Sequence, residues 1–281
     1  MLQISSGATV KTIDAIVFDG TNYLVIWTDD RKTLPNDPET TPGGWDVYGQ
    51  ILSKSATLVG SNFKISGTAG KNGAVAFDGT NYLVVWNEDV NDTDVNGKFI
   101  NKSGTAVSAE FVVNANSYYS DNSLSIAFDG TNYLVVWPDE VGGHGSGEWD
   151  LLGQIVAPSG SLSGGVINVS AATGPQLLPT IAFDGTNYLV TWTDMRNDAN
   201  HNVTCDSGEG TCWDIYGQYV SKSGTLVGSE FVINNDLDNQ LGGVVGFNGG
   251  KYFVIVDTGI APGTQGSRLD GGDVYGVFVT P

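Results

Sequence analysis

Hydrophobic and polar residues follow one another along this chain in a pattern that recurs five times. In the first copy, an apolar stretch ending at Phe18 is followed by a polar Asp-Gly-Thr-Asn turn and a second apolar stretch ending at Trp27. The eight residues from Phe18 onwards recur three times unchanged and once in divergent form, at 77–84, 128–135, 183–190 and 247–254. Aromatic and β-branched residues around a Gly/Asn turn are typical of a β-hairpin. Each copy is therefore predicted to begin with two antiparallel strands.

Each copy continues with further strand-like segments. A long polar loop leads to a third predicted strand, which opens with Asp and recurs at 46–52, 94–98, 150–154, 214–218 and 273–277. In the first four copies a short turn and a fourth apolar segment follow, at 57–65, 110–113, 166–169 and 230–233. Self-similarity of this kind is the signature of a repeat architecture. Short antiparallel strands in five copies predict an all-β fold, a five-bladed β-propeller with four-stranded blades.

The repeats are predicted to form a single β-propeller domain over residues 1–281. The blades are expected at approximately 6–66, 67–114, 115–170, 171–234 and 235–281 plus 1–5. The fifth copy has no fourth strand of its own, and Leu2–Ser5 precedes the first copy at the spacing of a fourth strand. We therefore expect the N-terminal strand to complete the last blade, which would remove two exposed sheet edges.

The repeat motifs resemble those of a known group of proteins. The succession Phe-Asp-Gly-Thr-Asn-Tyr-Leu-Val-Val-Trp, Asp-Ile-Tyr-Gly-Gln and Ser-Gly-Thr is similar to the propeller repeats of many secreted bacterial surface proteins, over essentially the whole chain. The resemblance implies a five-bladed propeller, tachylectin-like in architecture only, and an extracellular or cell-surface location. Residues 1–6 do not have the basic start and apolar core of a signal peptide. No motif matches the tachylectin-like or glycoside hydrolase propellers residue by residue, so the resemblance implies architecture and not activity.

The charge of the chain bears on its partners. The formal net charge is −19, from 31 acidic residues against 12 Lys and Arg. Nucleic acids and anionic membranes are bound through basic surfaces, so neither is an expected partner. No apolar run approaches the roughly 20 residues that cross a bilayer, which argues against membrane insertion. The oligomeric state stays open.

The long loops after the second strands are the expected site of binding. They differ from copy to copy, whereas the turns at the other end of the blades are nearly identical. Binding residues tend to lie on loops that a rigid scaffold holds in place. Tryptophans near the loop ends and aspartates at the start of the third strands are the candidate ligand-binding residues, namely Trp45, Trp149, Trp213, Asp46, Asp150 and Asp214. Packing of the loop base by Trp and capping of loop N–H groups by Asp are the alternative interpretations.

An acidic segment in the second copy is a candidate metal site. It gathers five oxygen-bearing side chains within seven positions: Glu88, Asp89, Asn91, Asp92 and Asp94. Ca²⁺ takes several oxygen ligands, and carboxylates are its usual source in proteins. The spacing is not that of an EF-hand loop. Ca²⁺ is therefore a candidate cofactor, and structural capping by the same carboxylates remains the alternative.

The chain contains two cysteines, Cys205 and Cys212, which enclose a Gly-rich segment. Their spacing suits a local disulfide, which would indicate an oxidising compartment. Two free thiols or a metal site are the alternatives, although only His201 lies near enough in sequence to supply a further metal ligand.

These observations favour a non-enzymatic recognition or adhesion module that binds a glycan or a surface protein through the long-loop face, with or without Ca²⁺. A structural subunit of a surface layer or fibre is one alternative. A glycoside-active enzyme is the other, since such enzymes need only two suitably spaced carboxyl groups. Because the loops differ, we expect few binding sites and not five equivalent ones.

Overall fold

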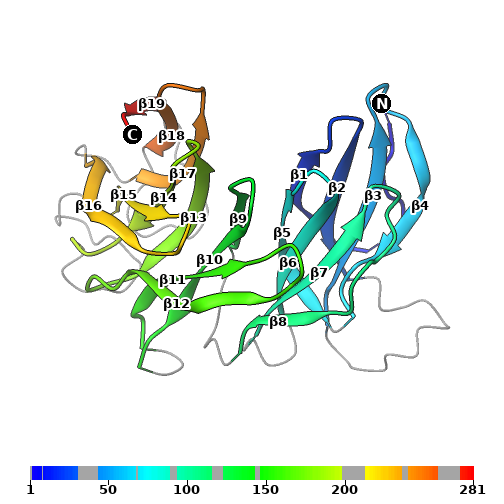
Figure 1. The fold of residues 1–281 in the computed structure, drawn as a ribbon, viewed down its shortest axis with the longest axis horizontal. Helices are drawn as coiled ribbons and strands as arrows, with labels where there is room; N and C mark the ends of the chain where they lie inside the picture. Colours follow the sequence, from blue (N-terminus) through cyan, green and yellow to red (C-terminus); the bar gives the residue numbers. More distant parts are fainter. Residues whose placement is uncertain are drawn as a thin grey trace. The chain divides into compact units, whose positions relative to one another are not determined.

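The computed structural model of the chain describes residues 2–7, 9–30, 44–67, 69–88, 94–115, 123–142, 146–197, 213–235, 240–258 and 273–281. All regular structure in these ranges is β-strand, and the strands form five antiparallel sheets (Figure 1). The fold is an all-β, five-bladed β-propeller, as the sequence pattern predicts. No helix in the described ranges could span a membrane.

The chain divides into two compact units, of which the first comprises residues 1–117 and 156–162. It contains two blades of four strands each. The strands of the first blade are β1 (Lys11–Phe18), β2 (Asn22–Asp29), β3 (Asp46–Ser53) and β4 (Leu58–Lys64). Those of the second are β5 (Gly70–Phe77), β6 (Asn81–Glu88), β7 (Val95–Asn101) and β8 (Phe111–Asn114).

The second unit comprises residues 118–155 and 163–281. The third blade consists of β9 (Ser125–Phe128), β10 (Tyr133–Glu140), β11 (Trp149–Val156) and β12 (Leu162–Ser170). The fourth consists of β13 (Gln176–Phe183), β14 (Asn187–Asp194), β15 (Asp214–Ser221) and β16 (Leu226–Asn234). The fifth has three strands, β17 (Gln240–Phe247), β18 (Tyr252–Thr258) and β19 (Val274–Val279).

The repeated Asp-Gly-Thr-Asn turn holds neighbouring blades together as well as closing its own hairpin. Asp19 Oδ1 accepts the backbone N–H groups of Thr21 and Asn22 at 2.7 and 2.6 Å. The other carboxylate oxygen of Asp19 accepts the Tyr82 hydroxyl of the next blade at 2.8 Å, and the Asp19 carbonyl accepts Lys102 Nζ at 3.2 Å. The same turn is built by Asp78, Asp129 and Asp184. At Asp19 the turn therefore both closes its own hairpin and contacts the next blade.

The second strands carry the most buried side chains of the blades. Apolar residues on both faces of these strands pack against the strands beside them and against the adjacent blade within the same unit. The largest fully buried side chains are the tyrosines at the start and the tryptophans near the end of these strands, among them Tyr82, Trp86, Tyr133, Trp137, Tyr188 and Trp192. Burying such aromatic rings contributes most of the packing energy of a core.

The last blade has three strands in the described residues and stops at β19, and the N-terminal segment, residues 2–6, is not assigned to a strand. The N-terminal segment instead lies against β4 of the first blade, where Asn62 Nδ2 donates to the Ile4 carbonyl at 3.0 Å. Whether this segment also completes the last blade stays a prediction.

The fifth blade covers its third strand without an aromatic residue from a fourth strand. In blades one, two and four, a Gly in the third strand lies under a fourth-strand ring, as Gly49 does under Phe63. In the fifth blade the equivalent Gly276 lies under Phe253 of β18, since a Cβ at Gly276 would be 2.3 Å from that ring. The other four copies have Leu at the position of Phe253. The larger side chain fills from within the sheet a space that a fourth strand fills elsewhere.

Candidate functional site

The structure brings together the acidic residues at the two ends of a long loop, as the sequence pattern suggests. Asp29 at the end of β2 lies directly opposite Asp46 at the start of β3. Asp194 and Asp214 face each other in the same way across β14 and β15. All four side chains are at least nine-tenths buried. Facing carboxylates in such positions repel each other unless cations compensate their charge.

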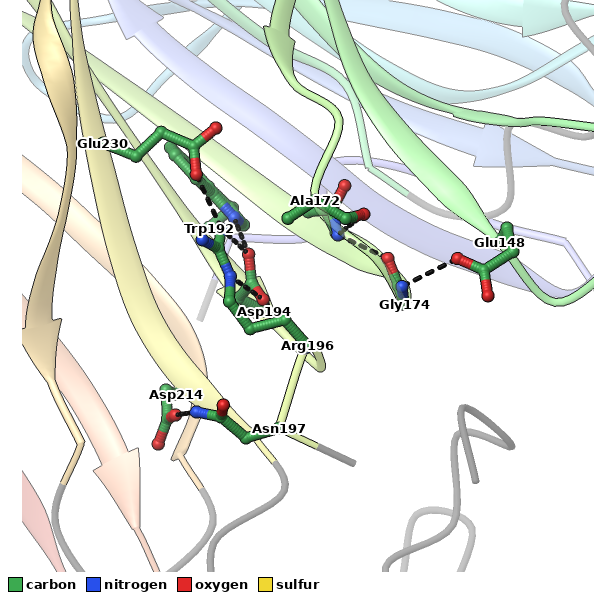
Figure 2. Close-up of polar contacts among 10 residues, drawn as sticks. Glu148, Ala172, Gly174, Trp192, Asp194, Arg196, Asn197, Asp214 and Glu230 are labelled. Carbon is green, nitrogen blue, oxygen red and sulfur yellow. Dashed lines mark hydrogen bonds and ion pairs between the residues drawn. The ribbon is translucent and has the colours of Figure 1, made fainter. Parts of the chain in front are cut away.

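Basic side chains compensate both pairs. In the first blade, Lys64 Nζ lies 3.1 Å from Asp46 and Lys11 Nζ lies 3.8 Å from Asp29. In the fourth blade, Arg196 compensates Asp194 (Figure 2). Buried carboxylates that are neutralised in this way have a structural explanation, whatever other role they have.

Arg196 is the centre of a polar cluster in the second unit. Its Nε and Nη2 donate to the two carboxylate oxygens of Asp194 at 2.8 and 2.6 Å, and Nη2 also donates to Glu230 at 2.7 Å (Figure 2). Its guanidinium carbon lies 3.9 Å from the centre of the Tyr216 ring. Trp192 Nε1 donates to Asp194 at 2.7 Å from the other side. The cluster joins β14, β15 and β16, so it stabilises one blade.

Two of the predicted ligand-binding aspartates have raised pKa values. Burial raises the pKa of Asp214, whose Oδ2 accepts the amide of Asn197 at 2.5 Å. Burial, followed by the negative charge of Glu148, raises the pKa of Asp150. Glu148 itself accepts the N–H of Gly174 at 2.7 Å (Figure 2). These carboxyl groups lie where the sequence places them, at the loop ends of the third strands.

The three candidate tryptophans lie at the base of the long loops and are partly buried. Their backbones connect neighbouring strands: the Trp45 carbonyl accepts the N–H of Gly70, and the Trp213 carbonyl accepts the N–H of Gln240 at 2.9 Å. Trp149 is the first residue of β11. A role of these rings in stacking against sugars stays a prediction.

The candidate Ca²⁺ segment lies only partly in the described residues. The N–H of Glu88 donates to the carbonyl of Asp94 at 2.9 Å, which closes the base of this loop. Asp89, Asn91 and Asp92 lie outside the described residues, as do Cys205, Cys212 and His201. In the parts of the chain that are described, no three His, Cys, Asp or Glu side chains gather as metal ligands. The Ca²⁺ site and the disulfide stay predictions.

The structure draws attention to an acidic residue that the sequence pattern did not single out, Asp14. It lies in the middle of β1, at a β-bulge between Ile13 and Ala15. β1 begins on the side of the blade where the long loop leaves, because Lys11 pairs with Asp29 at the end of β2. Asp14 is therefore three residues from the loop end of a first strand. Bulges often place a side chain for function.

Asp14 is unique among the five copies. It stands four residues before the Phe that opens the repeated motif, and the equivalent residues of the other copies are Gly73, Leu124, Pro179 and Gly243. The signal was thus present in the sequence, as the one acidic residue at a position that is otherwise apolar or Gly. The pattern of the long loops does not point to Asp14, because this residue lies in the interior of a first strand.

Residues of two blades surround the Asp14 carboxyl group. Thr28 Oγ1 on β2 donates to Asp14 Oδ2 at 2.8 Å. The backbone N–H of Gly73 on β5 forms a second hydrogen bond with the carboxylate. The N–H of Asn72 donates to Thr28 Oγ1 at 3.0 Å and so joins β5 to this group. Burial outweighs both hydrogen bonds and raises the pKa of Asp14 to about 6.

The raised pKa of Asp14 has a consequence for stability. The ordinary value is 3.8, so between about pH 4 and 6 the folded state binds more protons than the unfolded state. Stability that is present below pH 4 is therefore lost as the pH rises through 6. We expect Asp14→Asn to stabilise the protein by about 2 kcal/mol at pH 8 and by almost nothing at pH 4. Urea unfolding at the two pH values measures this, and an equal effect at both would contradict it.

Comparison with known proteins shows the fold. No protein family model matches the chain, and no curated protein is similar to it. An endo-arabinase from Bacteroides thetaiotaomicron is similar in structure, with a TM-score of 0.51 and 12% identity over 97% of this chain and 95% of that one. A Trypanosoma rangeli sialidase has a TM-score of 0.53 and 10% identity, over 98% of this chain and 45% of the sialidase. An alpha-L-arabinofuranosidase from Podospora anserina, in complex with cellotriose, has a TM-score of 0.48 and 8% identity over 95% of this chain and 90% of that one.

These likenesses correct the functional expectation. The endo-arabinase and the sialidase are, by their names, enzymes that act on glycosides. The expectation of a non-enzymatic recognition or adhesion module is therefore overturned, together with the expectation that the chain is not an enzyme. The glycoside-active alternative is the one that the proposal below takes up. Because the identities are so low, the likeness itself shows the fold, and an activity has to be argued from the site.

Proposed function

We propose that this protein is a glycoside-active enzyme in which Asp14 is the general acid. The observation that carries the proposal is the half-buried carboxyl group of Asp14, with a pKa raised to about 6, at a position where the other four copies have Gly, Leu or Pro. The likeness of the fold to an endo-arabinase and a sialidase supports it. A glycan is accordingly the proposed partner, and an extracellular or cell-surface location remains part of the proposal.

The chemistry of glycoside cleavage explains why such a carboxyl group is needed. A glycosidase uses two carboxyl groups, and the one that protonates the leaving oxygen must hold its proton near neutral pH. An exposed Asp with an ordinary pKa has lost this proton well below pH 6. Burial of Asp14 between two blades keeps the proton in place up to about pH 6. The protein would therefore work best in mildly acidic solution.

A screen of glycosides tests the proposal. The intact protein is incubated at pH 5.5 with arabino-, xylo- and galacto-oligosaccharides and with sialosides, and released sugar is measured against an Asp14→Asn variant as the matched blank. We expect at least one glycoside to be cleaved by the wild-type protein only. Cleavage of none of them, or equal cleavage by the variant, would contradict the proposed function. If a glycoside is cleaved by the wild-type protein only, Asn or Gln substitutions of the remaining acidic residues would identify the second carboxyl group.

A further inference from the structure

We propose that Thr28 is a positioning residue for Asp14, and that through Thr28 the contact between β2 and β5 controls how Asp14 holds its proton. The catalytic consequence of this inference rests on the proposed function, but the contact itself does not. Thr28 is nearly fully buried, with 4% of its surface exposed, so water does not compete for its hydroxyl group.

The hydrogen bonds of the Thr28 hydroxyl group fix its orientation. A hydroxyl group has one proton to donate and lone pairs that accept. The N–H of Asn72 can only donate, so it takes a lone pair of Thr28 Oγ1 at 3.0 Å. The proton of Thr28 is then left for Asp14 Oδ2 at 2.8 Å. Such a chain of donors favours the charged form of the carboxyl group and opposes the effect of its burial.

The backbone of β5 is shaped to complete this arrangement. Asn72 has a φ of 56°, a left-handed conformation that Asn tolerates better than most residues. It lies at the bulge of β5, between Lys71 and Ala74. At Gly73 a Cβ would lie 3.2 Å from Asp14 Oδ2 and 3.0 Å from the Ile26 side chain. The absence of a side chain there lets the backbone N–H of Gly73 approach the carboxylate.

The strands around Asp14 carry four other ionisable side chains. β1, β2 and β5 carry Lys11, Tyr23, Asp29 and Lys71. Lys11 and Asp29 pair with each other at 3.8 Å. The shift in the pKa of Asp14 comes from burial and from the hydrogen bonds of Thr28 and Gly73. Among the described residues, the hydroxyl group of Thr28 is the side-chain hydrogen bond that contributes to this shift.

The fourth blade supplies a matched control. Thr193 occupies in β14 the position that Thr28 occupies in β2, and its hydroxyl group accepts the N–H of Gly242 in the next blade at 2.8 Å. The position of Asp14 is taken there by Pro179. The hydrogen bond between blades is therefore a repeated structural feature, and only the first blade adds a carboxyl group to it.

The experiment compares Thr28→Val with Thr193→Val in the intact protein. The titration of the Asp14 carboxyl carbon is followed by NMR, with Asp14→Asn used to assign the signal. We expect Thr28→Val to move the midpoint to higher pH by up to about one unit, a roughly tenfold change in the acid dissociation constant. Thr193→Val should leave the titration midpoint of Asp14 unchanged. It should lower the midpoint of urea unfolding by about as much as Thr28→Val does. Thr28→Ser, which keeps the hydroxyl group, should restore the wild-type titration.

An unchanged midpoint in Thr28→Val would overturn the inference, and so would an equal shift in Thr193→Val, which would indicate general loosening of the blades. The proposed function can fail separately. If no glycoside is cleaved but the Thr28→Val midpoint moves, the proposed function fails and the positioning contact stands. If glycosides are cleaved, the decline of kcat/KM with pH should move with the NMR midpoint in Thr28→Val. A decline that stays in place while the NMR midpoint moves would contradict the assignment of Asp14 as the general acid and leave the positioning contact standing.

Discussion

Asp14→Asn should lower kcat for the cleaved glycoside by about 10²- to 10⁴-fold, the usual contribution of a general acid. An amide has no proton to give to the leaving oxygen at any pH, yet it has nearly the shape of the carboxylic acid. The Thr28 hydroxyl group can donate to the amide oxygen as it does to Asp14 Oδ2. We therefore expect KM to change little and the fold to be retained. Steady-state kinetics on the glycoside found in the screen measure the effect.

Asp78→Asn is the control for this substitution. It removes one carboxylate from the same unit, and so changes the net charge equally, but Asp78 caps the turn after β5 at the other end of a blade. The kcat of Asp78→Asn should stay within about twofold of the wild-type value. A fall as large as that of Asp14→Asn would mean that kcat responds to charge or stability and not to proton donation.

Arg196→Ala should destabilise the protein by about 3 kcal/mol, because it leaves Asp194 buried without its cation. Asp194 has no exposed surface, and it receives two hydrogen bonds from the guanidinium group. The substitution also removes a hydrogen bond to Glu230 and the contact with the Tyr216 ring. Urea unfolding at pH 7 measures the loss. Activity measured well below the unfolding transition should stay close to wild type.

Lys11→Ala is the matched control in the first blade. Asp29 is buried like Asp194 and accepts the Nε1–H of Trp27 as Asp194 accepts that of Trp192. Its ion pair with Lys11 is longer, 3.8 Å, and a hydroxyl group, that of Thr9, also donates to Asp29 at 2.7 Å. We expect a loss of about 1 kcal/mol or less. Equal losses for the two variants would mean that the bidentate geometry of Arg196 adds nothing.

The hairpins of the fold could be predicted because their signals are local. The turn at Asp19 needs only the next three residues, and its aspartate accepts two backbone N–H groups of the same turn. The strand that completes the last blade has no such local signal. A segment with the pattern of a fourth strand does not reveal whether its acceptor edge is available. The informative residue is Phe253, whose ring covers Gly276. This contact becomes apparent only in the three-dimensional structure.

The candidate site was predictable in position but not in chemistry. The sequence indicated that the acids at the loop ends would meet, and Asp29 and Asp46 do so. It did not indicate that Lys64 would lie 3.1 Å from Asp46, because that contact depends on the register of β4 against β3. Asp14 presents the opposite case. Its strand looks ordinary, and its raised pKa arises from burial against β2 and β5, which are distant in sequence, while the hydrogen bond from Thr28 opposes the rise.

The dependence of kcat/KM on pH, measured between pH 4 and 8 on the glycoside found in the screen, tests most directly whether Asp14 acts as a general acid. Because kcat/KM reports on ionisations of the free enzyme, the account predicts that it falls as the pH rises through about 6, where Asp14 loses its proton. A value that stays constant up to pH 8, or a decline that persists with the same midpoint in the residual activity of Asp14→Asn, would contradict the account.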